Sequence, residues 1–115
     1  MEIQRIQTKL AKFAKDRDWD QFHSPKNLSM ALSVEVAELV EIFQWMETGD
    51  LSEIKSLDKM KNVEEEIADI FIYLLKIADK FDIDLEKIID EKIKLNEQKY
   101  PISKSYGISK KYSDL

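Results

Sequence analysis

Two short segments of the chain each place two acidic residues three positions apart. The first pair is Glu35 and Glu38, and the second pair is Glu66 and Asp69. Both segments have the same order of residue types: acid, apolar residue, alanine, acid, apolar residue. This spacing puts both carboxylates of a pair on one side of an α-helix, because each residue advances about 100° around the helix axis. Two helices that pack together could therefore bring four carboxylates to one place.

Four carboxylates gathered in one place repel one another and favour a bound cation. At an effective dielectric constant near 20, two carboxylates about 5 Å apart repel by roughly 3 kcal/mol. A hard divalent cation relieves that repulsion, and ligation by oxygen alone favours magnesium, calcium or manganese over zinc or copper. We therefore predict a site for a hard divalent cation on these acids, with Mg²⁺, Ca²⁺ and Mn²⁺ as the candidates.

Two other interpretations of the acids fit less well. Acidic residues fill 23 of the 115 positions, so a single pair could simply be a solvated surface. Here, however, the residues one helical turn from each pair are mainly apolar or acidic. A di-iron bundle needs two Glu-x-x-His elements, and the single histidine, His23, lies outside both pairs. Magnesium held by carboxylates usually binds substrate phosphates as well, so phosphate-ester or phosphoanhydride chemistry is predicted.

Apolar residues that recur with the helical period predict the elements that carry these acids. Only two glycines and two prolines interrupt the chain, and 43% of the residues are hydrophobic while 36% are charged. That mixture is typical of amphipathic helices. The sequence predicts an all-α protein whose protomer is a four-helix bundle, with a polar link over residues 50–60 that has room for a helical turn. The predicted helices cover residues 2–16, 25–47, 62–80 and 84–100.

Capping residues mark where several of these helices begin and end. Ser24 followed by Pro25 is typical of an N-cap and a first helical turn. Asp84 is a candidate N-cap for the fourth helix. We expect Gly49 to stop the second helix and Pro101 to stop the fourth.

Each pair of acids lies beside an apolar stripe of its helix. On the second helix Glu35 lies at the edge of the stripe, and Glu38 lies about 60° further round the axis. On the third helix Glu66 lies at the edge, and Asp69 lies about 60° beyond it. If the two stripes pack together, the four carboxylates converge at the margin of one core. The stripes consist of Leu32, Val36, Leu39, Val40 and Phe43 on the second helix, and of Val63, Ile67, Ile70, Leu74, Ile77 and Phe81 on the third.

Length, charge and composition limit the class of protein. The 115 residues suffice for one domain with a modest core, which we place at residues 1–101, followed by a polar tail at residues 102–115. The net charge of −5 argues against nucleic acid or a membrane as partner. Cysteine is absent, and the sequence has neither an apolar signal core nor an apolar run of about 20 residues. We expect a soluble, cytoplasmic homo-oligomer, since so short a chain buries little alone.

Several short motifs, some of which include the acids, are distributed along most of the chain. They are WDQFH at 19–23, EVAEL at 35–39, FQW at 43–45, EIAD at 66–69, IYL at 72–74, Asn96 with KYP at 99–101, and KKY at 110–112. Together they resemble the MazG-like, all-α nucleotide pyrophosphohydrolases, and particularly the dCTP pyrophosphatase branch, over roughly residues 5–115.

The resemblance implies a reaction and a metal site. The reaction is hydrolysis of a nucleoside triphosphate between its α and β phosphates, which releases a monophosphate and pyrophosphate. The metal is magnesium on Glu35, Glu38, Glu66 and Asp69, the same four acids that the helical spacing selects. Members of the family are tetramers or dimers whose sites form between subunits.

The resemblance also implies which residues enclose the nucleobase, namely Trp19, His23 and Trp45. Aromatic side chains that stack on bases contribute about 1–3 kcal/mol each in nucleic-acid sites. Other roles are open for the same residues. Trp19, together with Phe22, could fasten the connector to the core, and His23 could be a surface or capping residue. Trp45 could form a wall of the metal pocket or part of a subunit interface.

Four further residues match positions near the sugar and phosphates of the nucleotide. Tyr73 lies between the two acids of the third helix, and Lys92 and Asn96 lie on the fourth helix. Lys99 stands where relatives carry an arginine just before Tyr-Pro, so a point-charge contact with phosphate replaces a bidentate one. A solvated helix face is the alternative for the three residues of the fourth helix.

We expect a water activated by the metal, with Glu38 or Glu35 as base, to attack the α phosphorus. The predicted role is removal of unwanted nucleotides from the pool, with dCTP or a modified dCTP as the leading substrate. Two alternatives remain open at this point. One is a related pyrophosphohydrolase that acts on dUTP or another nucleotide, and the other is a non-catalytic helical interaction module with a structural metal site.

Overall fold

The computed structural model of the protein describes residues 2–115. Over that range the chain forms six α-helices and two short 3₁₀ helices, and it contains no strand. The predicted all-α class is therefore confirmed. The predicted count of four helices is not, because two short helices join the four long ones. None of the helices among the described residues is long and apolar enough to cross a membrane.

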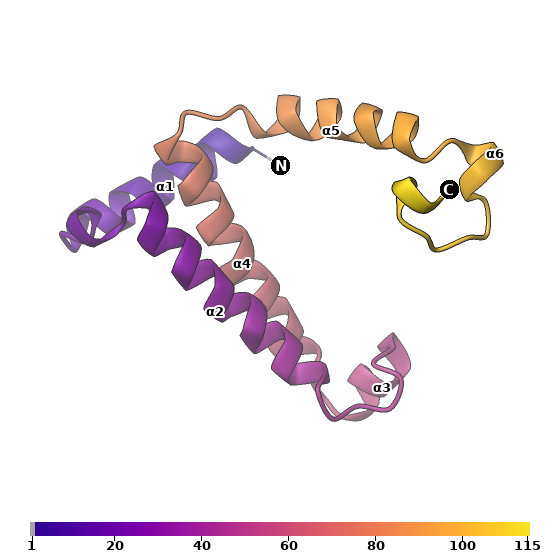
Figure 1. Ribbon diagram of the computed structural model, residues 1–115. Helices are drawn as coiled ribbons and strands as arrows, with labels where there is room; N and C mark the ends of the chain where they lie inside the picture. The colour runs from indigo at the N-terminus through magenta and orange to yellow at the C-terminus, as the bar shows by residue number, and fades with distance from the viewer. Residues whose placement is uncertain (1) are drawn as a thin grey trace. The chain divides into compact units, whose positions relative to one another are not determined.

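The chain divides into two compact units, one ending at Asp82 and one beginning at Ile83. In the first unit α2 and α4 lie side by side, and α3 joins them at one end (Figure 1). At the other end α1 packs against α4. The first unit thus has the paired helices that the acids require. Its elements are α1 (Ile3–Asp16), η1 (Asp20–Phe22), α2 (Pro25–Phe43), α3 (Leu51–Ser56) and α4 (Met60–Lys80).

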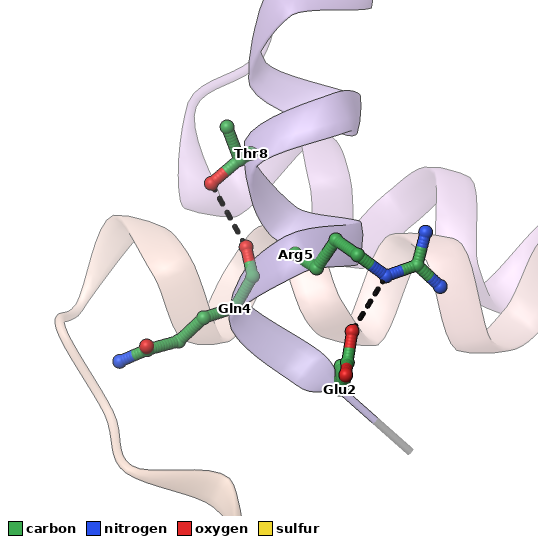
Figure 2. Close-up of polar contacts among 4 residues, drawn as sticks. All are labelled: Glu2, Gln4, Arg5 and Thr8. Carbon is green, nitrogen blue, oxygen red and sulfur yellow. Dashed lines mark hydrogen bonds and ion pairs between the residues drawn. The ribbon is translucent and has the colours of Figure 1, made fainter.

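The first turn of α1 has only exposed polar contacts (Figure 2). The Arg5 guanidinium donates a hydrogen bond from Nε to Glu2 Oε2 at 2.8 Å. The Thr8 hydroxyl donates to the backbone oxygen of Gln4 at 2.9 Å. An exposed ion pair of this kind contributes little to stability, so α1 is held mainly by its packing on α4. Gln7 adds one specific link, because its Nε2 donates to the backbone oxygen of Leu75 at 2.9 Å.

Three helices end with an aspartate in the left-handed conformation. Asp18, Asp58 and Asp82 have φ values of 55°, 54° and 52°, and each lies two residues after the last residue of α1, α3 or α4. Glycine is the usual residue at this position, although short polar side chains can also adopt the conformation. The turn at Asp18 brings the Trp19 backbone N–H to the Ala14 oxygen at 2.9 Å, which places Trp19 beside the end of α1.

The start of α2 is as predicted. Ser24 has extended backbone angles and its hydroxyl accepts a hydrogen bond from the Asn27 backbone N–H at 3.1 Å. Pro25 occupies the first position of the helix. The Asn27 side chain in turn donates to the Phe22 oxygen at 2.8 Å, so η1 is tied to the first turn of α2.

The end of α2 lies at Phe43, four residues before the predicted end at Glu47. The physical reason is Glu53 of α3, whose carboxylate accepts hydrogen bonds from the backbone N–H groups of Glu47, Thr48 and Gly49 at 3.1, 3.0 and 2.8 Å. These bonds pull the backbone into a turn instead of a further helical turn. Gly49 is part of that turn, with a φ of 65° that favours glycine.

The core of the first unit is small. Its buried side chains are Ala14, Leu28, Ile54, Val63, Leu75 and Ala78. Several residues of the two predicted apolar stripes stay substantially exposed in the protomer, with relative exposures of 42% for Val36, 60% for Val40 and 50% for Ile67. The helices α2 and α4 therefore pack through only part of their apolar surface.

The second unit consists of α5 (Leu85–Lys99), α6 (Ile102–Ser105) and η2 (Tyr112–Asp114). Asp84 caps α5 as predicted, because its side chain accepts a hydrogen bond from the Lys87 backbone N–H at 3.2 Å. The helix ends before Pro101, also as predicted. The residues after Pro101 return to the end of α5, where the Tyr100 hydroxyl accepts a hydrogen bond from the Tyr112 backbone N–H at 3.2 Å.

Candidate metal centre

Three of the four predicted acids converge at the interface of α2 and α4. Glu35 and Glu38 come from α2, and Glu66 comes from α4. One carboxylate oxygen from each lies within 4.8 Å of the others. Glu35 and Glu38 are about one helical turn apart, so both lie on one side of α2. The packing of α2 against α4 through the adjoining face brings Glu66 beside them. These three residues are called the carboxylate cluster below.

Asp69 lies near the cluster, but its carboxylate oxygens are not among those that lie within 4.8 Å of one another. Its negative charge raises the pKa of Glu35 and of Glu66, so it shares their surroundings. A metal ion bound by the three clustered acids would have Asp69 beside it as a fourth negative charge.

Burial and neighbouring acids raise the pKa of Glu35 and of Glu66, and no lysine or arginine forms an ion pair with the cluster among the described residues. Burial raises the pKa of Glu35, the nearby carboxyls of Glu66, Glu38 and Asp69 act in the same direction, and together they bring it to about 7. Burial also raises the pKa of Glu66, and the charges of Glu38 and Asp69 add to that effect. Crowded carboxyls hold protons more tightly because full ionisation would bring several negative charges together.

Two carboxylate oxygens of the cluster have no hydrogen-bond partner. They are Glu35 Oε2 and Glu66 Oε2, and both are buried. A buried polar atom without a partner is costly, and coordination to a hard cation would satisfy both atoms at once. The donor set, which consists of carboxylate oxygens from two rigid helices, therefore fits a divalent cation such as magnesium.

Tyr73 lies on α4 one helical turn beyond Asp69. Burial raises the pKa of its hydroxyl, and the charges of Glu35 and Asp69 raise it further. The phenol therefore stays protonated beside the acids and can donate a hydrogen bond to an anionic ligand. Its position next to the sugar and phosphates of a nucleotide stays a prediction.

Trp19 and His23 form an aromatic group at the beginning of α2. The Trp19 ring packs edge-to-face on Phe13 of α1, with ring centroids 5.7 Å apart. It also packs edge-to-face on the His23 ring at 6.1 Å. Packing of this kind holds both rings in a defined orientation, and Trp19 is still 42% exposed. The contact with Phe13 supports the fastening role, while the exposed part of the ring is free for a ligand.

Trp45 lies at the opposite end of α2 from Trp19 and His23. The helix between them has 19 residues, which at 1.5 Å per residue is about 28 Å. Figure 1 shows the two ends of α2 well apart, one beside α1 and the other beside α3. Trp45 is 89% exposed. One protomer therefore does not bring the three residues predicted to enclose the base into a single pocket.

The remaining predicted residues lie in the second unit. Lys92, Asn96 and Lys99 are all on α5, with spacings that place them along one side of the helix. The side chains of Lys92 and Asn96 are exposed, and the Lys99 ammonium lies 4.7 Å from the centroid of the Tyr112 ring. This cation–π contact holds the lysine that precedes Tyr-Pro against the returning tail.

Lys76 was not among the predicted site residues. Its Nζ lies 2.9 Å from His23 Nδ1, and it lines a cavity of about 160 Å³ that does not include the carboxylate cluster. The signal in the sequence is a single lysine between apolar residues, in the order Leu74, Leu75, Lys76, Ile77. A charged residue in such a run suggests a specific partner, but the sequence does not indicate which one.

Comparison with known proteins connects this arrangement to one family. The sequence model of the MazG-like family matches residues 30–115. Over 106 residues the chain is 41% identical to dCTP pyrophosphatase 1 of Rattus norvegicus and 39% identical to dCTP pyrophosphatase 1 of Homo sapiens. Each match covers 91% of this chain and 62% of the relative, so the chain spans less than two thirds of the length of these relatives.

A solved structure has a similar fold. It is the crystal structure of a pyrophosphatase from Archaeoglobus fulgidus, which is 42% identical to this chain. The two structures superpose with a TM-score of 0.78, over 88% of this chain and 94% of the other. The similarity in sequence and fold extends over nearly the whole of that protein.

Proposed function

The chain belongs to the MazG-like family, and from that premise we propose that it hydrolyses a nucleoside triphosphate to the monophosphate and pyrophosphate in a magnesium-dependent reaction. dCTP or a modified dCTP is the proposed substrate, because the dCTP pyrophosphatase 1 relatives are about 40% identical over most of the chain. Removal of such nucleotides from the pool is the corresponding role.

The observation that carries the proposal is the carboxylate cluster. Glu35, Glu38 and Glu66 bring their oxygens within 4.8 Å of one another, and two of these oxygens are buried without a partner. A purely structural cluster of acids would gain from lysine or arginine partners, yet none of the ion pairs found among residues 2–115 involves these three side chains. The arrangement therefore supports a site built for a cation and for the phosphates that accompany it.

The residues of the site have separable tasks in this proposal. Magnesium, when bound, would supply positive charge for the phosphate oxygens and for the leaving group. Glu35, Glu38 and Glu66 would hold the cation, and Asp69 would add negative charge beside them. Glu38 is exposed and is assigned the role of base that accepts the proton of the attacking water. Tyr73 keeps its proton and donates a hydrogen bond to the substrate.

The base pocket is proposed to form between subunits of a homo-oligomer, either a dimer or a tetramer. Trp19 and His23 lie about 28 Å along α2 from Trp45, so one protomer cannot close all three around a base. A second copy that presents its Trp45 end to the Trp19 end of the first would complete the enclosure. The exposed apolar residues of α2 and α4 supply the surface for such an assembly, and a four-helix bundle is the corresponding packing.

The test is incubation with each of the dNTPs and magnesium, followed by separate analysis of pyrophosphate and orthophosphate. We expect pyrophosphate, with the highest kcat/KM for dCTP. Release of orthophosphate would mean that a different bond is cleaved. A preference for dUTP would move the substrate to another base, and no turnover of any nucleotide would favour a non-catalytic module with a structural metal site.

A further inference from the structure

Lys76 of α4 makes a polar contact with His23, the residue that directly follows η1. Lys76 Nζ lies 2.9 Å from His23 Nδ1, and both residues are partly buried. The two residues are 53 positions apart in the sequence, so tertiary packing alone brings them together. Two nitrogen bases at this distance must share one proton between them.

The donor properties of the two groups decide where that proton lies. A lysine ammonium has three N–H donors and no acceptor, whereas a neutral imidazole has one donor nitrogen and one acceptor nitrogen. The ordinary pKa values are 10.5 for lysine and 6.5 for histidine. This gap of about four units favours the proton on lysine by roughly 10⁴. Lys76 therefore donates, His23 Nδ1 accepts, and the remaining ring proton lies on Nε2.

The charges around the imidazole ring act in the same direction on balance. Burial lowers the pKa of His23, and the positive charges of Lys76 and Lys80 lower it further, while Asp20 opposes them. Asp20 is itself engaged, since its carboxylate lies 3.8 Å from Lys80 Nζ. The His23 ring also packs edge-to-face on Trp19, a contact that favours a defined ring orientation.

We infer that Lys76 is a positioning residue that holds His23 as the neutral tautomer protonated at Nε2, so that the ring offers a single N–H donor to an acceptor atom of a nucleobase. The identity of the acceptor rests on the proposed function, whereas the state of the ring does not. A ring nitrogen or a carbonyl oxygen of a pyrimidine can accept from Nε2–H, but an exocyclic amino group cannot.

The state of the ring can be measured directly, because His23 is the only histidine of the chain. In ¹⁵N-labelled protein, two-bond ¹H–¹⁵N spectra report which ring nitrogen carries the proton at each pH. We expect Nδ1 to give an acceptor signal and Nε2 a protonated signal at neutral pH. In Lys76→Met the Nδ1 signal should move toward the averaged position of a free ring, and the pKa of His23 should rise.

Two further variants separate the hydrogen bond from the charge. Lys80→Met removes a neighbouring positive charge that does not contact the ring nitrogen, so the pKa of His23 should rise while the tautomer signals stay unchanged. Lys76→Arg retains a cationic donor and should restore the signals of the original protein. An Nδ1–H tautomer in the original protein, or unchanged signals in Lys76→Met, would overturn the assignment.

Kinetics with dCTP test the contact with the base. Lys76→Met should raise KM by about tenfold, as expected for the loss of one well-placed hydrogen bond, with kcat within a factor of about two. Unchanged KM, or a loss confined to kcat, would show that the ring does not contact the base. If no nucleotide is hydrolysed while the NMR signature holds, the proposed function fails and the assigned state of His23 stands.

Discussion

The side chain of Glu35 is subject to two opposing requirements. Burial and the neighbouring carboxyls favour its protonated form, with a pKa raised to about 7. Cation binding requires the ionised form, because a carboxylate coordinates metal only after it has lost its proton. Protons and magnesium therefore compete for the same group near neutral pH. Glu38 belongs to the same cluster but is exposed, so its side chain has more freedom to move when a ligand binds.

Magnesium should raise Tm, and Glu38→Gln should largely remove that gain. The substitution keeps the size of the side chain but removes a negative charge from the carboxylate cluster. We also expect hydrolysis to fall by about 100-fold or more, as is common when a general base is lost. Thermal unfolding with and without magnesium, together with a pyrophosphate-release assay, measures both effects.

Glu41→Gln is the matched control for this experiment. Glu41 is another exposed acid of α2 and lies outside the cluster, so both the magnesium effect and the activity should be retained. Equal magnesium-dependent shifts in the original protein and in Glu38→Gln would contradict the metal site.

The stability of the metal-free protein should fall as pH rises from about 5 to about 8 through the contribution of Glu35. Its pKa is raised from 4.5 to about 7 by folding, so the native state holds a proton that the unfolded state releases. This contribution is fully present below the unfolded pKa and is lost as pH rises through the folded pKa. Comparison of Tm against pH with Glu35→Gln, in the presence of EDTA, isolates the effect.

Magnesium should reverse this trend, because the ionised cluster binds the cation more tightly. The gain in Tm from magnesium should therefore be larger at about pH 8 than at about pH 5.5. A gain that does not depend on pH over this interval would mean that Glu35 does not lose a proton when the cation binds.

At the scale of the elements, short-range turns determine where the helices end and which side chains they present. The α2 helix stops at Phe43 because Glu53 binds the backbone of the next residues. The hydrogen bonds from Gly49, Glu47 and Thr48 lower the pKa of Glu53. The position of Trp45 in the turn after α2 depends on this arrangement.

Glu53→Ala should lower Tm by a few degrees and increase the mobility of the turn that carries Trp45. The loss leaves three backbone N–H groups without their carboxylate acceptor. Ser52→Ala, at the neighbouring exposed position of α3, should have little effect on either property. Thermal unfolding and the fluorescence anisotropy of the tryptophans would measure these changes, and equal effects of both substitutions would contradict the role of Glu53.

Asp58→Gly should stabilise the first unit by about 0.5–1 kcal/mol. Asp58 has a φ of 54° after α3, and a left-handed conformation costs a residue with a side chain about 1–2 kcal/mol, which the greater flexibility of unfolded glycine partly offsets. Urea unfolding measures the change. Asp58→Val should destabilise instead, and a loss of stability in Asp58→Gly would mean that the aspartate side chain makes a compensating interaction.

At the scale of the whole molecule, the apolar surface of α2 and α4 exceeds what one protomer buries. Val36, Val40 and Ile67 stay 42–60% exposed, although all three lie on the stripes that the helical period predicts as core. The buried core of the first unit consists of only six residues among those the structure describes. A second copy of the chain would remove this surface from water.

Val40→Lys should shift the protein from the proposed oligomer toward monomer. A lysine at a position that is 60% exposed in the protomer leaves the fold of one chain intact but places an unpaired charge in the interface. Size-exclusion chromatography with light scattering measures the mass. Glu41→Gln, at the next position of the same helix, changes the net charge by the same one unit and is the control, and a monomeric original protein would contradict the proposed assembly.

The sequence by itself predicted several features that depend on residues a few positions apart, although it missed the early end of α2, where Glu53 binds backbone N–H groups four to six positions away. Local helical geometry predicts the four long helices and places each pair of acids on one side of its helix. The caps at Ser24 and Asp84 are equally local. The motifs for the family are local in the same sense. Confirmation of the family therefore required no knowledge of how distant segments pack.

Only the tertiary structure decided the features that depend on distant contacts. The pairing of Lys76 with His23 joins residues 53 positions apart. The tertiary structure also places Trp45 and Trp19 at opposite ends of α2, and the proposed pocket between subunits rests on that separation. Burial, shared protons and distances across the fold are properties of packing, and helical periodicity does not encode which side chains packing will bring together.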